Sequence, residues 1–131
     1  MDSPPEARVG LLDGFALEIG GSGLPRVVDD LPRCAQRVIA LLSLCGRPAR
    51  AAVAGALWPD VPEDRAHGSL RSALWRVQRV VPGLLEVFGG ALGLARGVRV
   101  DVHEFRDWAR RVLDPNAVVE GFLAPELARA G

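Results

Sequence analysis

The sequence predicts an α+β domain in which a helical centre stands between two β-hairpins. Short apolar stretches flank Asp13-Gly14 near the N-terminus and Gly89-Gly90 further along the chain, and such dipeptides are typical of tight hairpin turns. Between the two hairpins, apolar residues recur every three to four positions, which is the period of a helix that packs on one side. Strands and helices in separate parts of the chain indicate an α+β fold.

The N-terminal region is expected to form a small antiparallel sheet. Strands are predicted at residues 9–12 and 15–19, and a weaker third strand at 24–30, which Pro25 keeps short or at an edge. Residues 1–7 are expected to be a disordered tail. This region contains no pattern of residues that indicates chemistry.

Three helices are predicted next. The first runs from Pro32 or Arg33 to about Cys45, and Gly46 is a typical residue just after a helix. A shorter helix covers residues 48–58. A long helix covers residues 63–81, and Asp60 and Glu63 have the spacing of a capping box at its start. The residues expected to be buried in the first two helices are Cys34, Val38, Leu41, Leu42, Cys45, Val53, Leu57 and Trp58.

The chain continues with a hairpin and a fourth helix. Residues 84–88 and 91–95 are predicted to pair, so that a helix-turn-helix is followed by a hairpin, which is the arrangement of a winged helix. Residues 98–100 are expected to extend the hairpin sheet. Asp101 and Glu104 predict a second capping box, and the helix that follows ends near residue 113. Its buried side is expected to contain Val102, Phe105, Trp108 or Ala109, and Val112.

The long helix at residues 63–81 is the most informative segment. On a helical wheel one side is apolar. The other side has no carboxylate after Asp64, whereas a solvated helix face usually mixes charge signs to form pairs four residues apart. Arginine side chains on such a face suit the DNA major groove, where they bind guanine edges. The residues predicted to face bases are Arg71, Ser72, Trp75, Arg76 and Arg79.

Trp75 has two interpretations at this stage. Its ring can stack against a thymine methyl group or a sugar, or it can pack over the base of the hairpin. Four further residues, at or near helix starts, are candidate phosphate contacts, because helix N-termini attract anions. They are Arg37, Arg50, Arg65 and His67.

The distribution of charge supports a nucleic-acid interface although the net charge is zero. Residues 33–82 contain eight arginines and three acidic residues, a balance of +5, whereas the segments before and after them have balances of −4 and −1. Positive charge is therefore concentrated around the long helix, as expected of a DNA-binding domain. All sixteen basic residues are arginines.

Other classes of function find little support in the sequence. His67 and His103 lie on different predicted helices, and no metalloprotease, hydrolase or phosphate-loop motif occurs, so an enzyme, a metal site and a cofactor are not expected. Cys34 and Cys45 would lie about 16 Å apart along one helix, too far for a disulfide. No apolar run is long enough to span a membrane, and the N-terminus lacks a signal-peptide pattern, which predicts a cytoplasmic protein.

Several motifs together resemble a known family. They are Leu57-Trp58-Pro59-Asp60, Arg65-Ala66, residues 70–79 (LRSALWRVQR) and residues 98–105 (VRVDVHEF). In this order, across roughly residues 8–113, the sequence is similar to the N-terminal DNA-binding domain of the Streptomyces antibiotic regulatory protein family. The hairpin tip, residues 88–91, contains no Arg or Lys, where related winged helices often have one for the minor groove.

The resemblance implies an OmpR/PhoB-type winged helix at residues 8–100, with an N-terminal antiparallel sheet, a three-helix core and a C-terminal hairpin. Residues 101–131 would be a C-terminal helix and the start of an activation domain. The implied function is transcriptional activation on direct repeats of double-stranded DNA near promoters, in contact with RNA polymerase and as a dimer on the DNA. The alternative is a protein-interaction module of the same fold that docks on RNA polymerase or another regulator.

Overall fold

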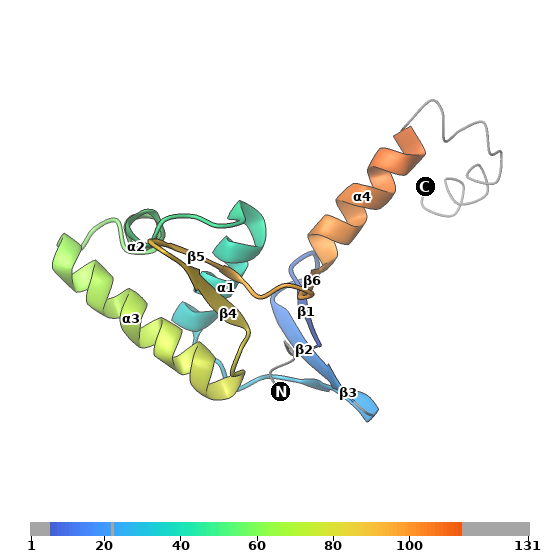
Figure 1. Cartoon of the computed structure of the whole chain (residues 1–131), viewed down its shortest axis with the longest axis horizontal. Helices are drawn as coiled ribbons and strands as arrows, with labels where there is room; N and C mark the ends of the chain where they lie inside the picture. Colours follow the sequence, from blue (N-terminus) through green and yellow to red (C-terminus); the bar gives the residue numbers. More distant parts are fainter. Residues whose placement is uncertain (1–5, 22, 114–131) are drawn as a thin grey trace.

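A computed structural model of the chain shows an α+β fold and describes residues 6–21 and 23–113 (Figure 1). The elements, in order, are β1 (Ala7–Gly10), β2 (Ala16–Gly21), β3 (Gly23–Val27), α1 (Arg33–Cys45), α2 (Arg50–Leu57), α3 (Glu63–Val80), β4 (Leu85–Phe88), β5 (Ala91–Leu94), β6 (Arg99–Val100) and α4 (Asp101–Leu113). The predicted activation segment after Leu113 and most of the predicted tail lie outside the described residues. None of the described helices has the length and apolar character that would let it span a bilayer.

The N-terminal strands belong to a four-stranded sheet with the order β3-β2-β1-β6. Strands β1 and β2 pair antiparallel, with Val9 opposite Leu17, and both side chains are fully buried. The connection between them, residues 11–15, is longer than the predicted two-residue turn. Gly14 has a φ of 84° there, a value that L-amino acids rarely adopt.

Strand β6 does not extend the hairpin sheet, and this prediction was wrong. It pairs in parallel with β1, so that Val100 lies opposite Val9 and is only 3% exposed. The physical reason is burial, because joining the N-terminal sheet places Val100 in the main core. Position along the chain suggested pairing with the nearest strand, but it is beside β1 that Val100 becomes buried.

Helices α1, α2 and α3 pack together over one core (Figure 1). Helix α1 ends at Gly46, whose φ is 76°, close to the predicted position. Its buried side was only partly predicted. Leu42 is buried as expected, but Ala35 and Ile39 are also buried and were not predicted, and Leu41 is only half-buried. Cys34 is also half-buried, and Cys45 is exposed because the last residue of α1 extends beyond the core. Trp58, expected in the core, is half-buried against its edge.

The two predicted capping boxes do not form. Pro62 precedes α3 with extended backbone and no side-chain cap, so Asp60 lies outside the helix. Asp101 is already helical. Its carboxylate accepts hydrogen bonds from the backbone N–H groups of Leu11, at 2.9 Å, and Leu12, at 3.1 Å, and also interacts with the backbone N–H of Val102. The spacing of a capping box therefore occurs twice in the sequence without its hydrogen bonds.

Strands β4 and β5 form the predicted hairpin, in which Phe88 pairs with Ala91 across Gly89-Gly90. The connection between α1 and α2 runs along its second strand. Ala49 bridges to Ala91, and the backbone N–H of Arg50 donates to the carbonyl of Gly90 at 2.9 Å. The hairpin is thus fixed at its tip to the start of α2.

Helix α4 projects away from the rest of the fold (Figure 1). Its first turn is fixed to the four-stranded sheet, because Glu104 binds Arg8 of β1 at 2.9 Å and Arg99 of β6 at 2.7 Å. Phe105, predicted to be inside, is 55% exposed, and its ring centre lies 5.8 Å from that of the half-buried Trp108. The prediction failed because α4 contacts the rest of the fold mainly through β1 and β6, near its own start.

Both carboxylates at the start of α4 have lowered pKa values. Partial burial by itself raises the pKa of Asp101, but hydrogen bonds from the backbone of Leu11 and Leu12 outweigh it, and the net pKa lies below the ordinary 3.8. Hydrogen bonds from Arg99 and then Arg8 lower the pKa of Glu104 below 4.5. Both groups therefore stabilise the fold more when ionised than when protonated.

We expect Asp101→Asn to lower the free energy of unfolding at pH 7 by about 1 kcal/mol, because an amide oxygen accepts weaker hydrogen bonds than a carboxylate. Because the pKa of Asp101 is lower in the folded state than in the unfolded state, ionised Asp101 stabilises the fold at pH values above the unfolded-state pKa, near 3.8. This stabilisation is lost as the pH falls through the lower pKa of the folded state. Urea denaturation at pH 7 and pH 3 measures the effect. An equal difference between variant and wild type at both pH values would contradict the assignment.

Candidate nucleic-acid interface

The two sides of α3 lie in different surroundings. Its apolar side is part of the core, where Ala66, Leu70, Ala73 and Val77 are at most 3% exposed. The side chains on the opposite side are all exposed: Arg71, Ser72, Trp75, Arg76 and Arg79. These five are the residues predicted to face bases, and the structure brings them together on one surface, here called the arginine face.

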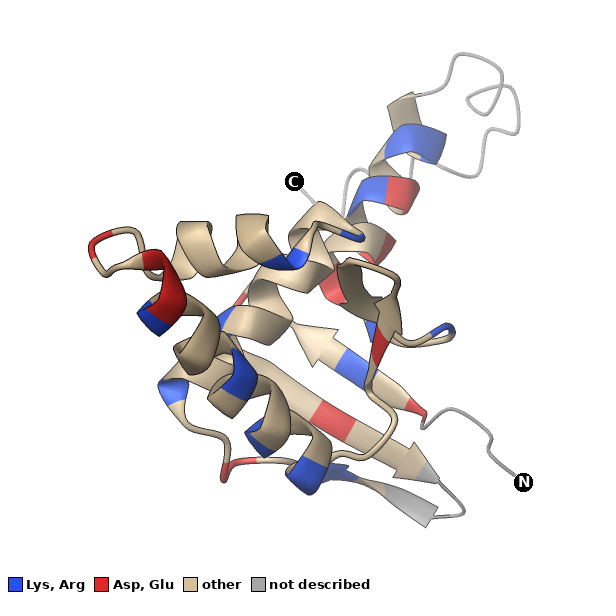
Figure 2. Ribbon diagram, turned by 60° about the vertical axis from the view of Figure 1, so that its left-hand side comes forward, with Lys and Arg blue, Asp and Glu red and all other residues tan. Residues whose placement is uncertain are grey.

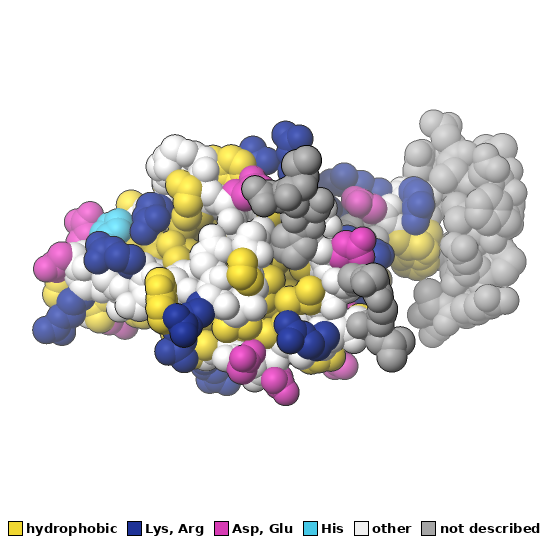
Figure 3. All heavy atoms as spheres, turned by 60° about the horizontal axis from the view of Figure 1, so that its bottom comes forward, with side chains coloured by type: hydrophobic (Ala, Val, Ile, Leu, Met, Phe, Trp, Pro, Cys, Tyr) yellow, Lys and Arg dark blue, Asp and Glu magenta, His cyan; other side chains and the backbone are white. Residues whose placement is uncertain are grey.

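The guanidinium groups of the arginine face form no ion pair with any of the described residues. In the described part of the chain, no carboxylate oxygen lies within 4 Å of a guanidinium nitrogen of Arg71, Arg76 or Arg79. Basic residues recur along α3, whereas its acidic residues, Glu63 and Asp64, are confined to the first turn (Figure 2). Figure 3 views α3 from below and shows Lys and Arg side chains gathered along this surface. An anion that approaches α3 therefore meets unpaired positive charge.

Trp75 belongs to the arginine face and not to the core. Its side chain is 57% exposed, and the guanidinium carbon of Arg79 lies 5.0 Å from its ring centre. A cation above an indole ring is held by electrostatic attraction worth about 0.5–1 kcal/mol at an exposed site. Of the two interpretations of Trp75, exposure favours contact with a ligand over packing against the hairpin.

Two open hollows lie along the arginine face. Arg71, Ser72, Trp75 and Arg76 line the first. The second continues toward the end of α3, where Asp30 joins Trp75, Arg76 and Arg79. Asp30 comes from the connection between β3 and α1 and was not among the predicted site residues. Its position could not be derived from the sequence, because only the packing of the sheet beside α3 brings it there.

The four candidate phosphate contacts do not form one group. Arg65 is exposed in the first turn of α3, and His67 is half-buried with Nε2 3.9 Å from a carboxylate oxygen of Glu63. Arg50 is half-buried at the start of α2. Arg37 is exposed on α1, but its Nη2 donates a hydrogen bond of 3.0 Å to the carbonyl of Leu57, the last residue of α2. Arg37 therefore has a structural contact as well as free donors.

The sequence analysis did not select Arg47, which the structure places on the hairpin. Its guanidinium carbon lies 3.9 Å from the ring centre of Phe88, next to the uncharged hairpin tip. No sequence signal links the two residues, because the contact depends on how the connection between α1 and α2 pairs with β5. The hairpin tip therefore has an adjacent positive charge that its own residues do not supply.

Comparison of the chain with family models, curated proteins and solved structures found no match in any of the three.

We expect Arg37→Ala to lower the free energy of unfolding by about 1 kcal/mol, because it leaves the Leu57 carbonyl without its charged donor. Arg76→Ala should change stability by less than about 0.5 kcal/mol, because Arg76 is exposed and has no acidic partner among the described residues. Urea denaturation of both variants gives the comparison. A larger loss in Arg76→Ala than in Arg37→Ala would mean that Arg76 supports the fold.

Proposed function

We propose that this protein is a sequence-specific double-stranded DNA-binding regulator of transcription with a winged-helix fold of the OmpR/PhoB type. Helix α3 enters the major groove with the arginine face toward the bases. The observation that carries the proposal is the exposed arginine face, which forms no ion pair with a carboxylate of residues 6–21 and 23–113, on a helix whose other side is packed in the core. Guanidinium groups bind guanine edges and phosphates through paired N–H donors.

The dimensions of α3 suit this role. Its 18 residues extend about 27 Å at 1.5 Å per residue, and an α-helix fits within the major groove, about 12 Å wide. Arg76 lies in the middle of the arginine face and is the proposed principal base contact. Trp75 adds an apolar surface for a thymine methyl group. Arg50 and Arg65, near the starts of α2 and α3, are proposed to hold phosphates.

The motif resemblance to the Streptomyces antibiotic regulatory proteins supports a more specific proposal. In this proposal the protein activates transcription from direct repeats near promoters, contacts RNA polymerase, and binds DNA as a dimer. The alternative, a protein-interaction module of the same fold, predicts no selective retention of duplex DNA, so one binding experiment separates the two functions.

The first test is the salt dependence of binding to duplex DNA. If about five to seven phosphates are neutralised, the logarithm of the association constant should fall with the logarithm of salt concentration with a slope of about −5 to −6. Fluorescence anisotropy over a salt series from about 50 to about 300 mM measures the slope. A shallow slope, together with no enrichment of any sequence from a randomised duplex pool, would favour the protein-interaction module.

The second test separates base contacts from phosphate contacts, using sites enriched from that pool. Arg76→Ala should weaken binding to the preferred site by about 1–3 kcal/mol and relax the preference at one base position. Arg50→Ala should weaken binding to all sequences alike. Arg110→Ala removes the same charge from α4, away from the arginine face, and serves as the matched control (Figure 1). Equal effects of Arg76→Ala and Arg50→Ala on every sequence would refute the assignment of Arg76.

A further inference from the structure

The hairpin formed by β4 and β5 has no basic residue of its own. Residues 85–94, including the turn Gly89-Gly90, contain one charged residue, Glu86. A surface of this composition provides no electrostatic attraction for nucleic acid. The charge at the hairpin instead comes from Arg47, in the connection between α1 and α2.

Arg47 is held on the hairpin by its surroundings. Its guanidinium carbon lies 3.9 Å from the ring centre of Phe88. The stem of Arg47 lies over Gly93, where an added Cβ would come within 3.1 Å of the Arg47 Cγ and 2.9 Å of the Phe88 ring. Gly93 therefore provides the space in which the arginine and the ring lie together. Its backbone does not require glycine, since its φ is not positive.

The backbone on both sides of this contact is fixed. The N–H of Leu92 donates to the carbonyl of Pro48, and the N–H of Arg50 donates to the carbonyl of Gly90, each at 2.9 Å. Arg47 directly precedes this paired segment. The side chain thus starts from a fixed position, and less conformational entropy is lost when it binds a ligand.

The guanidinium group of Arg47 remains available for binding. The residue is exposed, and in the described part of the chain no carboxylate oxygen lies within 4 Å of its side-chain nitrogens. Contact with an aromatic ring uses the flat face of a guanidinium group, while its five N–H donors lie along the edge. Such an edge matches two oxygens of one phosphate group.

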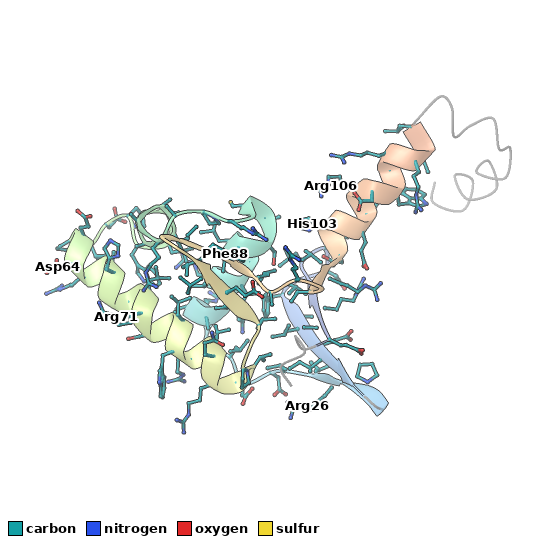
Figure 4. The ribbon with its side chains drawn as sticks, viewed as in Figure 1. Arg26, Asp64, Arg71, Phe88, His103 and Arg106 are labelled. Atoms are coloured by element: carbon teal, nitrogen blue, oxygen red, sulfur yellow. The ribbon has the colours of Figure 1, made fainter. Side chains whose placement is uncertain are left out.

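The hairpin also lies beside α3. The side-chain amide of Gln78 on α3 contacts the carbonyl of Leu85 at 3.5 Å, and its Oε1 accepts a hydrogen bond from Gly83 N–H at 3.1 Å. Figure 4 labels Arg71 on α3 and Phe88 on the hairpin, two elements drawn next to each other. The hairpin therefore begins against the second half of α3, the helix along which the duplex is proposed to lie.

We propose that Arg47, held on Phe88, binds a backbone phosphate of the duplex and extends the DNA contact from α3 to the hairpin. This inference rests on the proposed function, because it needs a duplex along α3. In this arrangement the contact of Arg47 with the phosphate does not depend on the DNA sequence, and the arginine face determines the sequence specificity.

The test measures binding of the full chain to its enriched duplex site and to a mismatched duplex over a salt series. Arg47→Ala should weaken both complexes several-fold and make the salt slope less steep by about 1, with the base preference unchanged. Phe88→Leu keeps every charge but removes the ring, and Gly93→Ala displaces the pair, so each should weaken binding without removing a cation. Arg47→Lys should restore most of the slope, and Arg110→Ala is the control.

The outcomes separate this inference from the proposed function. A wild-type chain with a shallow slope and no enriched site overturns both. A wild-type chain with a steep slope, whose Arg47→Ala variant has the same slope and affinity, overturns only the role of Arg47. A relaxed base preference in Arg47→Ala would overturn the assignment to phosphate. Thermal unfolding of each variant is measured alongside binding. If a variant loses DNA binding only in proportion to its loss of folded protein, the result counts against the proposal.

Discussion

Burial of the apolar side of α3 is the constraint on which the rest of the structure depends. Leu70, Ala73 and Val77 are fully buried, so the helix has only one rotation about its axis that satisfies the core. That rotation also determines which side chains remain outside. The arginine face is exposed because the apolar stripe on the other side of α3 is buried. Burial of that stripe therefore both stabilises the fold and orients the proposed interface.

A second set of interactions, at the start of α4, is electrostatic and not apolar. Glu104 joins Arg8 and Arg99, and Asp101 holds the backbone of the β1–β2 connection. These contacts add to the burial of Val100 in holding β6 and α4 against β1. The arginines of β1 and β6 form ion pairs with Glu104, whereas those of the arginine face form none within the part of the chain that the structure describes. The arginines whose ion pairs stabilise the fold, on β1 and β6, therefore lie in a different part of the molecule from the arginines proposed to bind a ligand, on α3.

The success of the sequence predictions varied with the distance over which each interaction acts. The period of α3, the Gly89-Gly90 turn and the end of α1 at Gly46 were correctly predicted, because each depends on residues a few positions apart. The capping box at Asp101 and Glu104 failed because of distant interactions. Asp101 and Glu104 found partners far along the chain, in Leu11 and Arg8, and those partners outweigh a local cap. Phe105 was misplaced because a periodic apolar stripe shows which side of a helix is apolar, not whether another element covers it.

The sequence by itself determined the α+β class, the helices, and the composition of the arginine face, because helical periodicity and local turns are properties of neighbouring residues. Only the tertiary structure decided that β6 joins β1, that Asp30 lies beside Arg79, and that Arg47 lies over Phe88. Each of these contacts brings together residues that are distant in the chain. Their formation depends on how whole elements pack to bury apolar surface, and no local pattern encodes that result.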